Sequence, residues 1–257
     1  MSVRLEREGP LARIVLDAPP LNLFDEAMFA GLEAAVDEVE ADPPRALLLR
    51  AEGKVVSGGV DVKVFDAIES SAEAGELWRR LLALPRRLER LPFPTVFAAH
   101  GLCLTAAFEI SLGCDLILAA ESARFGLVEI VVGLTPAMGG TQRLAERAGP
   151  GRARELVMTG ELYDAATLER WNVVNRVLGD DGFAEAAEAF AARLASGPTR
   201  AHAATKAVVR GALDGGVDAA DELIPDVAGR LFDTEDLRNA VRSFLSEGPG
   251  KATYTGR

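Results

Sequence analysis

Residues 95–119 read TVFAAHGLCLTAAFEISLGCDLILA, and this stretch decides the fold. Its two ends, 95–99 and 115–119, are short continuous apolar runs, typical of strands that are buried on both faces. A further apolar segment, 104–112, lies between them. Together with the elements on either side, this stretch indicates a chain in which strands alternate with helices. We therefore expect α/β layering and not an all-β fold.

The same alternation extends toward the N-terminus. Two alternating apolar–polar runs, 3–6 and 11–16, are joined by the Gly9-Pro10 turn and predict a hairpin. A helix is expected from the N-cap Asp25 to Pro43-Pro44, with an apolar face made of Phe29, Leu32, Val36 and Val39. A buried strand at 46–49 and a glycine-rich loop at 53–59 follow it. The next expected element is a helix at 73–91 that Pro85 kinks or splits.

The C-terminal half of the sequence is mostly helical in pattern. One late strand is expected at 173–177, directly after a helix end at Trp171-Asn172, because Asn tolerates the left-handed C-cap conformation. After Gly197-Pro198 the chain is rich in Ala and predicts further helices. We therefore expect two units, a core of residues 1–197 and a helical region of residues 198–257.

Composition excludes several classes of function. Of the 257 residues, 49% are hydrophobic, which supports a sizeable core. The formal net charge of −11 repels phosphate backbones, so we expect no nucleic-acid partner. No apolar run approaches the ~20 residues of a membrane span, so no membrane partner is expected. The first residues lack the apolar core of a signal peptide, which favours a cytoplasmic location.

Cysteine, histidine and tryptophan receive structural interpretations. Cys103 and Cys114 each occupy an apolar stretch and are expected in the core, because two cysteines cannot make a disulfide framework. The two histidines have no second His or Cys at ligand spacing, so no metal site is expected. Trp78 and Trp171 are interpreted as packing anchors and not as ligand contacts.

Three segments carry candidate chemistry. The glycine-rich turn 53–63 leaves backbone N–H groups free to point at a polarised oxygen, although an ordinary surface turn has the same composition. Glu109 and Glu129 are single acids in apolar runs, as in general acid–base sites, although a helix residue that faces solvent is the alternative for Glu109. Their positions do not show whether they meet in space. The sequence has no Gly-x-Ser-x-Gly or His-Glu-x-x-His motif, so carboxylates and backbone donors are its expected catalytic groups.

Several motifs follow one another along the chain: Pro20-Leu21-Asn22, Ser57-Gly58-Gly59-Val60-Asp61, Cys114-Asp115 with Ala123-Arg124-Phe125-Gly126, Glu129 with Gly133-Leu134-Thr135-Pro136, Gly139-Gly140-Thr141-Gln142-Arg143-Leu144, Glu155-Leu156-Val157-Met158-Thr159-Gly160, and Val173-Val174-Asn175-Arg176-Val177. Each motif alone is weak. In this order, over nearly the whole chain, they resemble the crotonase, or enoyl-CoA hydratase/isomerase, superfamily.

This resemblance implies a spiral of ββα units over residues 1–197 and a C-terminal helical trimerisation region over 198–257, in homotrimers or homohexamers. Members of the superfamily bind acyl-CoA thioesters. Coenzyme A is part of the substrate, so no separate cofactor is expected. Two backbone N–H groups hold the thioester oxygen and stabilise the enolate-like charge of the reaction. By motif position these are the amides of Val60 and Ala106.

The two hydratase glutamates of the superfamily correspond to Glu109 and Glu129. In such hydratases both acids hold the water; the Glu129 position is credited with protonating Cα, and the Glu109 position with helping to activate the water. The resemblance also implies contacts with substrate or CoA from Leu21, Ser57, Gly59, Val60, Asp61, Val62, Lys63 and Ala137. Candidates to hold the CoA nucleotide, partly from a neighbouring subunit, are Lys63, Lys206, Phe244 and Lys251.

Three departures separate this sequence from the usual hydratase pattern. Thr105-Ala106-Ala107 replaces a Gly-Gly-Gly stretch, Val60 stands where Ala or Gly is typical, and Ala137 replaces a glycine. Each residue keeps its N–H but adds bulk near the thioester or the water. The sequence favours an enoyl-CoA hydratase that adds water syn across a 2-enoyl-CoA. The alternatives are another crotonase-type acyl-CoA isomerase or lyase, or a catalytically silent CoA-thioester-binding homologue.

Overall fold

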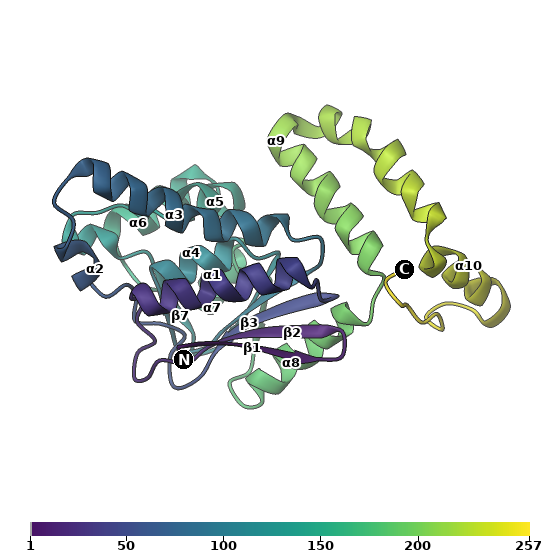
Figure 1. Ribbon diagram of the computed structural model, residues 1–257, viewed down its shortest axis with the longest axis horizontal. Helices are drawn as coiled ribbons and strands as arrows, with labels where there is room; N and C mark the ends of the chain where they lie inside the picture. Colours follow the sequence, from purple (N-terminus) through teal and green to yellow (C-terminus); the bar gives the residue numbers. More distant parts are fainter. Residues whose placement is uncertain (1) are drawn as a thin grey trace.

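A six-stranded sheet forms the centre of the computed structural model, which describes residues 2–257 (Figure 1). Its strands lie in the order β1 (Val3–Glu8), β2 (Leu11–Leu16), β3 (Ala46–Ala51), β4 (Thr95–Ala99), β6 (Leu116–Ala120) and β9 (Arg176–Leu178). β1 and β2 are antiparallel, which confirms the predicted hairpin. The other neighbouring strands are parallel, so their connections carry helices.

Helices cover both faces of this sheet, as its continuous apolar strands predict. Along β3, Leu47 packs in the cluster that contains α1 (Glu26–Ala41), whereas the next residue, Leu48, packs in the cluster that contains α8 (Phe183–Ala195). Figure 1 shows α1 and α8 on opposite sides of the strands. α1 begins at the predicted N-cap Asp25, whose side chain accepts a hydrogen bond from the first turn.

A second, three-stranded sheet positions the two acids singled out in the sequence. Its strands are β5 (Leu102–Leu104), β7 (Arg124–Gly126) and β8 (Tyr163–Asp164), in that order. α4 (Ala106–Leu112), which carries Glu109, follows β5, and the 3₁₀ helix η1 (Glu129–Val132) follows β7. β5 and β7 are parallel neighbours, so the segments that leave them emerge at the same end of the sheet.

α3 (Ser71–Arg90) runs without interruption through Pro85, so the alternative that this proline splits the helix is wrong. Pro85 is buried against Gly113, where an added Cβ would lie 2.9 Å from the proline Cα. This packing offsets the local cost of a proline inside a helix, about 3 kcal/mol. The remaining helices before α8 are α2 (Lys63–Asp66), α5 (Gly140–Ala148), α6 (Pro150–Thr159) and α7 (Ala165–Arg170).

The late strand β9 starts at Arg176 and not at Val173, which corrects the prediction. Val173 and Val174 are buried, but both of their N–H groups donate to the Leu168 carbonyl in α7, at 2.9 and 3.2 Å. The chain is therefore still turning at these residues. Asn172 has a φ of 62°, which confirms the left-handed conformation expected at this helix end.

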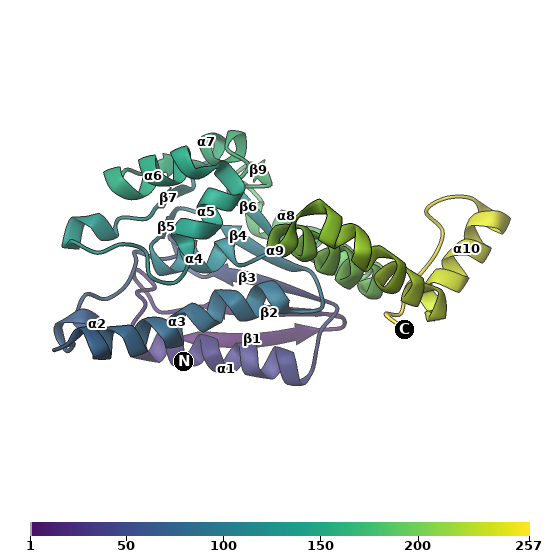
Figure 2. The same ribbon diagram turned by 90° about the horizontal axis from the view of Figure 1, so that it is seen from above.

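The C-terminal region is helical, as predicted, and projects away from the sheet (Figure 1, Figure 2). It contains α9 (Thr199–Gly229), the 3₁₀ helix η2 (Arg230–Asp233) and α10 (Glu235–Glu247). α9 is interrupted at Gly216, which has a φ of 84°. Among residues 2–257, no helix is long and apolar enough to cross a membrane. The division of the chain at residue 197 stays a prediction.

Candidate active site

Glu109 and Glu129 line the same small cavity, whose volume is about 20 Å³. Val60 and Ala137 line it as well, so the structure brings four of the predicted site residues together. The other walls come from Phe29, Phe65, Trp78, Leu81, Leu134, Thr135 and Met138. A cavity of this size holds about one water molecule. The two acids therefore face a common space in which a single water fits.

Glu109 is buried, so the alternative of a helix residue that faces solvent is wrong. Its Oε2 atom accepts hydrogen bonds from the N–H groups of Met138 (2.9 Å), just before α5, and of Gly140 (2.7 Å), the first residue of α5. Gly140 permits this approach, since a Cβ there would lie 2.7 Å from the Glu109 Cγ. Burial and the nearby charge of Glu129 together raise the pKa of Glu109 to about 8, against the opposing effect of the Gly140, Met138 and Ala137 amides.

Glu129 is the first residue of η1, and its carboxylate has little support from the protein. Its Oε2 atom is buried and has no hydrogen-bond partner among residues 2–257. Burial raises the pKa of Glu129 to about 7. Two adjacent acids with pKa values near neutrality favour a state in which one carries a proton and the other is ionised. Such a pair can donate a proton at one point and accept one at another.

The Val60 and Ala106 amides lie on neighbouring segments. Ser57 and Cys103 form a parallel bridge, and a Cβ on Gly59 would lie 2.9 Å from the Thr105 hydroxyl, so the residues directly before Val60 and Ala106 lie side by side. Neither the Val60 nor the Ala106 N–H group donates a hydrogen bond within residues 2–257. Unpaired backbone amides are the donors that an oxyanion hole uses, and of these two only Val60 lines the cavity; their role as an oxyanion hole stays a prediction.

Thr105, the residue before Ala106, has a backbone conformation that favours glycine. Its φ is 46° and its ψ is −117°, values that a β-branched residue adopts only under strain. Its hydroxyl is buried without a hydrogen-bond partner among the described residues. This hydroxyl lies 2.9 Å from the place of a Cβ on Gly59, whose φ is 111°. The Thr105 side chain thus fills the space between the two loops that carry the unpaired amides.

Thr105→Gly is expected to stabilise the fold. It removes the backbone strain and the unpaired buried hydroxyl, each about 1–3 kcal/mol, and loses a smaller amount through chain entropy and side-chain packing. We expect a gain of about 1 kcal/mol in the free energy of unfolding, measured by urea denaturation. Thr105→Ala, which keeps the Cβ and hence the strain, should gain less. A Thr105→Gly variant less stable than the wild type would contradict this interpretation.

Ser57 and Leu21 shape the loop that leads to Val60. The buried Ser57 hydroxyl donates to the Asn22 carbonyl (2.7 Å) and accepts from the Gly59 N–H (3.0 Å), so it ties two segments together. The Leu21 carbonyl accepts from the Gly58 N–H (2.8 Å), and the Leu21 side chain is 45% exposed. These residues position the loop, and their contacts with substrate stay predictions.

Asp61, Val62 and Lys63 lie at the outer end of the same loop, where α2 begins. The Asp61 carboxylate accepts a hydrogen bond from the Lys63 N–H (3.1 Å), and the side chains of Val62 and Lys63 are exposed. None of the three lines the cavity of the two acids. They are accessible from solvent, so a contact with an extended ligand that enters the cavity stays a prediction.

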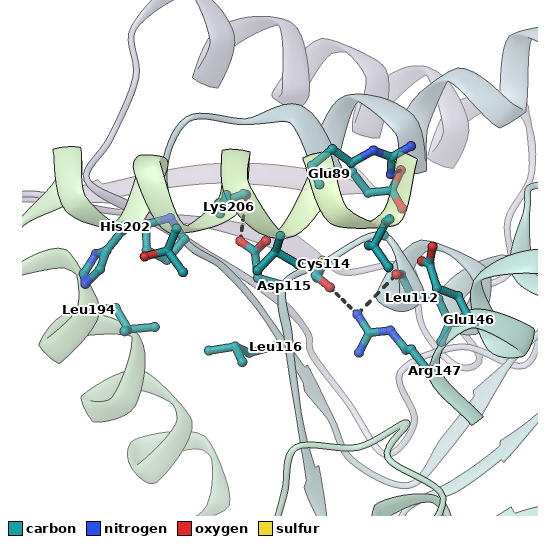
Figure 3. Close-up of a pocket in the computed structure, with 16 residues that line it drawn as sticks. Glu89, Leu112, Cys114, Asp115, Leu116, Glu146, Arg147, Leu194, His202 and Lys206 are labelled. Carbon is teal, nitrogen blue, oxygen red and sulfur yellow. Dashed lines mark hydrogen bonds and ion pairs between the residues drawn. The ribbon is translucent and has the colours of Figure 1, made fainter. Parts of the chain in front are cut away.

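A larger cavity of about 550 Å³ lies beside α9, and neither Glu109 nor Glu129 lines it. Figure 3 shows Lys206 in this cavity beside Asp115; their charged atoms are 2.7 Å apart. The Lys206 ammonium also donates to the Phe93 carbonyl (3.0 Å). The charge of Lys206 is thus already paired, and the structure does not bring it to the acids. Phe244 and Lys251 are exposed in the C-terminal region.

The structural interpretations of the cysteines are confirmed, since Cys103 and Cys114 are both buried. Trp171 packs on Tyr163, with ring centroids 4.8 Å apart. Trp78 also packs against the core, but it lines the cavity of the two acids, which was not anticipated. A signal was present in the sequence, because Trp78 and Leu81 are one turn apart on the apolar side of the same predicted helix.

This mixed α/β fold, with two acids that converge on one cavity, is that of the crotonase class of enzymes. The chain belongs to the enoyl-CoA hydratase/isomerase family, whose model matches residues 6–255.

Relatives and a solved structure agree with this assignment. The chain is 30% identical over 252 residues to a short-chain-enoyl-CoA hydratase of Clostridium acetobutylicum, with 96% of this chain and 95% of the relative covered. It is 28% identical over 251 residues to a crotonyl-CoA hydratase of Syntrophomonas wolfei, with 96% and 95% covered. The crystal structure of an enoyl-CoA hydratase subunit from Geobacillus kaustophilus superposes with a TM-score of 0.92 at 30% identity, over 100% of this chain and 99% of that one.

Proposed function

We propose that this protein is an enoyl-CoA hydratase that adds water syn across the double bond of a 2-enoyl-CoA thioester. The observation that carries the proposal is the convergence of Glu109 and Glu129 on a cavity that holds about one water. Hydration needs one group that accepts a proton from water and one that gives a proton to carbon. Two acids with pKa values near neutrality supply both.

In the proposed mechanism the water lies between the two carboxyl groups. Glu109, fixed by two backbone amides, helps to activate the water by accepting one of its protons as the water oxygen forms a bond to Cβ of the substrate. Glu129, whose Oε2 has no partner among residues 2–257, delivers the proton to Cα. Charge that develops on the thioester oxygen is stabilised by the amides of Val60 and Ala106.

The remaining predicted contacts belong to the same proposal. The thioester and the CoA arm would pass over the loop of Leu21, Ser57, Gly59, Asp61, Val62 and Lys63, and Ala137 would lie beside the water. Addition of water to an alkene changes no oxidation state overall, so the mechanism requires no redox cofactor. The two amides stabilise the thioester oxygen in the way that a metal ion would in other enzymes, so no metal is required either.

The test is an assay of crotonyl-CoA hydration, followed as loss of the enoyl absorbance. We expect turnover and formation of 3-hydroxybutyryl-CoA. Conversion of a 3-enoyl-CoA to its 2-enoyl isomer without hydration would favour an isomerase, an alternative suggested by the extra bulk at Val60 and Thr105. Binding of acyl-CoA with no turnover on short, medium or branched enoyl-CoA thioesters would favour a silent binding homologue and exclude the hydratase.

We also propose that residues 198–257 assemble the chain into a homotrimer or homohexamer. This region exposes many large apolar side chains, which usually marks an interaction surface: Val209, Leu213, Val217, Leu223, Ile224, Phe232, Val241, Phe244 and Leu245. Sedimentation should give three or six times the chain mass of 27.2 kDa. Phe232→Asp should lower the oligomer mass, whereas Met158→Asp, at an exposed position outside this region, should not. A monomeric wild type would contradict the proposal.

A further inference from the structure

The space beyond the two acids is closed by large side chains. Phe29 comes from α1, Phe65 from α2, and Trp78 and Leu81 from α3. They leave a cavity of only about 20 Å³ at the acids. An acyl chain whose double bond lies beside the water held by Glu109 and Glu129 would therefore meet this wall after few further carbon atoms, because packed side chains do not yield volume freely.

Trp78 and Phe65 form an aromatic pair within the wall of the cavity. The Trp78 indole packs against the ring of Phe65, with centroids 5.7 Å apart and the planes inclined by 54°. It is half-buried on the core side of α3. An aromatic pair of this geometry is held by packing on both rings. The Trp78 ring therefore packs on Phe65 and on the core.

We propose that Trp78, supported by Phe65, limits this enzyme to short acyl chains of about four carbon atoms, so that crotonyl-CoA is preferred over 2-octenoyl-CoA. This inference rests on the proposed hydratase function and specifies the substrate class of the same site. Trp78 acts as a specificity determinant because it occupies the path of a longer chain. It takes no part in proton transfer, which belongs to Glu109 and Glu129.

The chain provides a matched control, since its only other tryptophan is Trp171. Trp171 packs on Tyr163 and lies 4.5 Å from the Arg152 guanidinium, and it does not line the cavity. Trp78→Leu and Trp171→Leu therefore remove the same volume, the first inside the proposed acyl path and the second outside it.

The experiment measures kcat/KM for crotonyl-CoA and 2-octenoyl-CoA in the wild type and both variants. We expect the wild type to prefer crotonyl-CoA at least ~10-fold, a usual size for discrimination by pocket volume. Trp78→Leu should raise the ratio of 2-octenoyl-CoA to crotonyl-CoA efficiency at least ~10-fold, and Trp171→Leu should leave it unchanged. If Trp78→Leu does not fold, as judged by circular dichroism, Phe65→Leu should move the ratio in the same direction.

Calorimetric binding of butyryl-CoA and octanoyl-CoA separates this inference from the hydratase proposal. Tighter binding of butyryl-CoA, reversed in Trp78→Leu, supports the inference even if no hydration is seen. Hydration with equal efficiency on both chain lengths, or a ratio that neither the Trp78 nor the Phe65 variant moves, overturns it while the hydratase proposal stands.

Discussion

Replacement of Glu129 by Gln is expected to lower kcat for crotonyl-CoA hydration by at least ~10²-fold, with KM nearly unchanged. Glu129 has a buried Oε2 atom without a partner among residues 2–257 and a pKa of about 7, so it can release a proton near neutral pH. A Gln amide fills the same space but has no acidic proton to give. The loss should therefore fall on the chemical step and not on substrate binding.

Glu121→Gln serves as the control for this prediction, because Glu121 is exposed and lies outside the cavity. Its rate should equal that of the wild type. The Glu109→Gln, Glu129→Gln double variant should lose much less than the product of the two single losses, because the acids act as a unit. A Glu129→Gln enzyme that retains the full hydration rate would remove Glu129 from the mechanism.

The sequence predicts most of the strands and singles out the two acids as candidate catalytic residues, but it does not show that the two acids meet in space. The buried strands at 95–99 and 115–119 follow from continuous apolar runs, and both are present as β4 and β6. Glu109 and Glu129 meet because they follow β5 and β7, which pair in parallel within a small second sheet. That pairing is a contact between segments distant in sequence, and periodicity within one segment carries no information on it.

The differences between prediction and structure have the same physical origin. Val173 and Val174 have the composition of a strand, but hydrogen bonds to Leu168 keep them in the turn that ends α7. Pro85 remains inside a helix because Gly113 provides a surface on which it packs. In each case a tertiary contact overrides a local preference, so the local sequence alone could not reveal the outcome.

Replacement of Glu109 by Gln is also expected to lower kcat by at least ~10²-fold and, in addition, to change the pH profile. In the wild type the pair loses its two protons near pH 7 and 8, as the pKa values of about 7 for Glu129 and about 8 for Glu109 indicate. The singly protonated pair has both an acid and a base. The wild-type kcat/KM should therefore fall below about pH 7 and above about pH 8.

In Glu109→Gln the base is absent and only Glu129 titrates. The pKa of Glu129 is raised by its own burial, so it should stay near 7 in this variant. The residual kcat/KM should then remain level as the pH falls below this value and decline only above it. If the residual kcat/KM of the variant fell at both low and high pH, the fall at low pH would belong to the titration of another group.

The thermal stability of Glu109→Gln as a function of pH provides a second test that does not depend on enzyme activity. Burial raises the pKa of Glu109 from its ordinary value of 4.5 to about 8, so the folded state favours the protonated carboxyl group. The contribution of this protonated carboxyl group to the free energy of unfolding is fully present below about pH 4.5 and is lost as the pH rises through about 8. A Gln side chain keeps an oxygen that accepts from Met138 and Gly140 and never ionises. The difference in Tm between variant and wild type should therefore increase in favour of the variant from pH 5 to pH 9. A pH-independent difference would show that Glu109 is not buried in the folded protein.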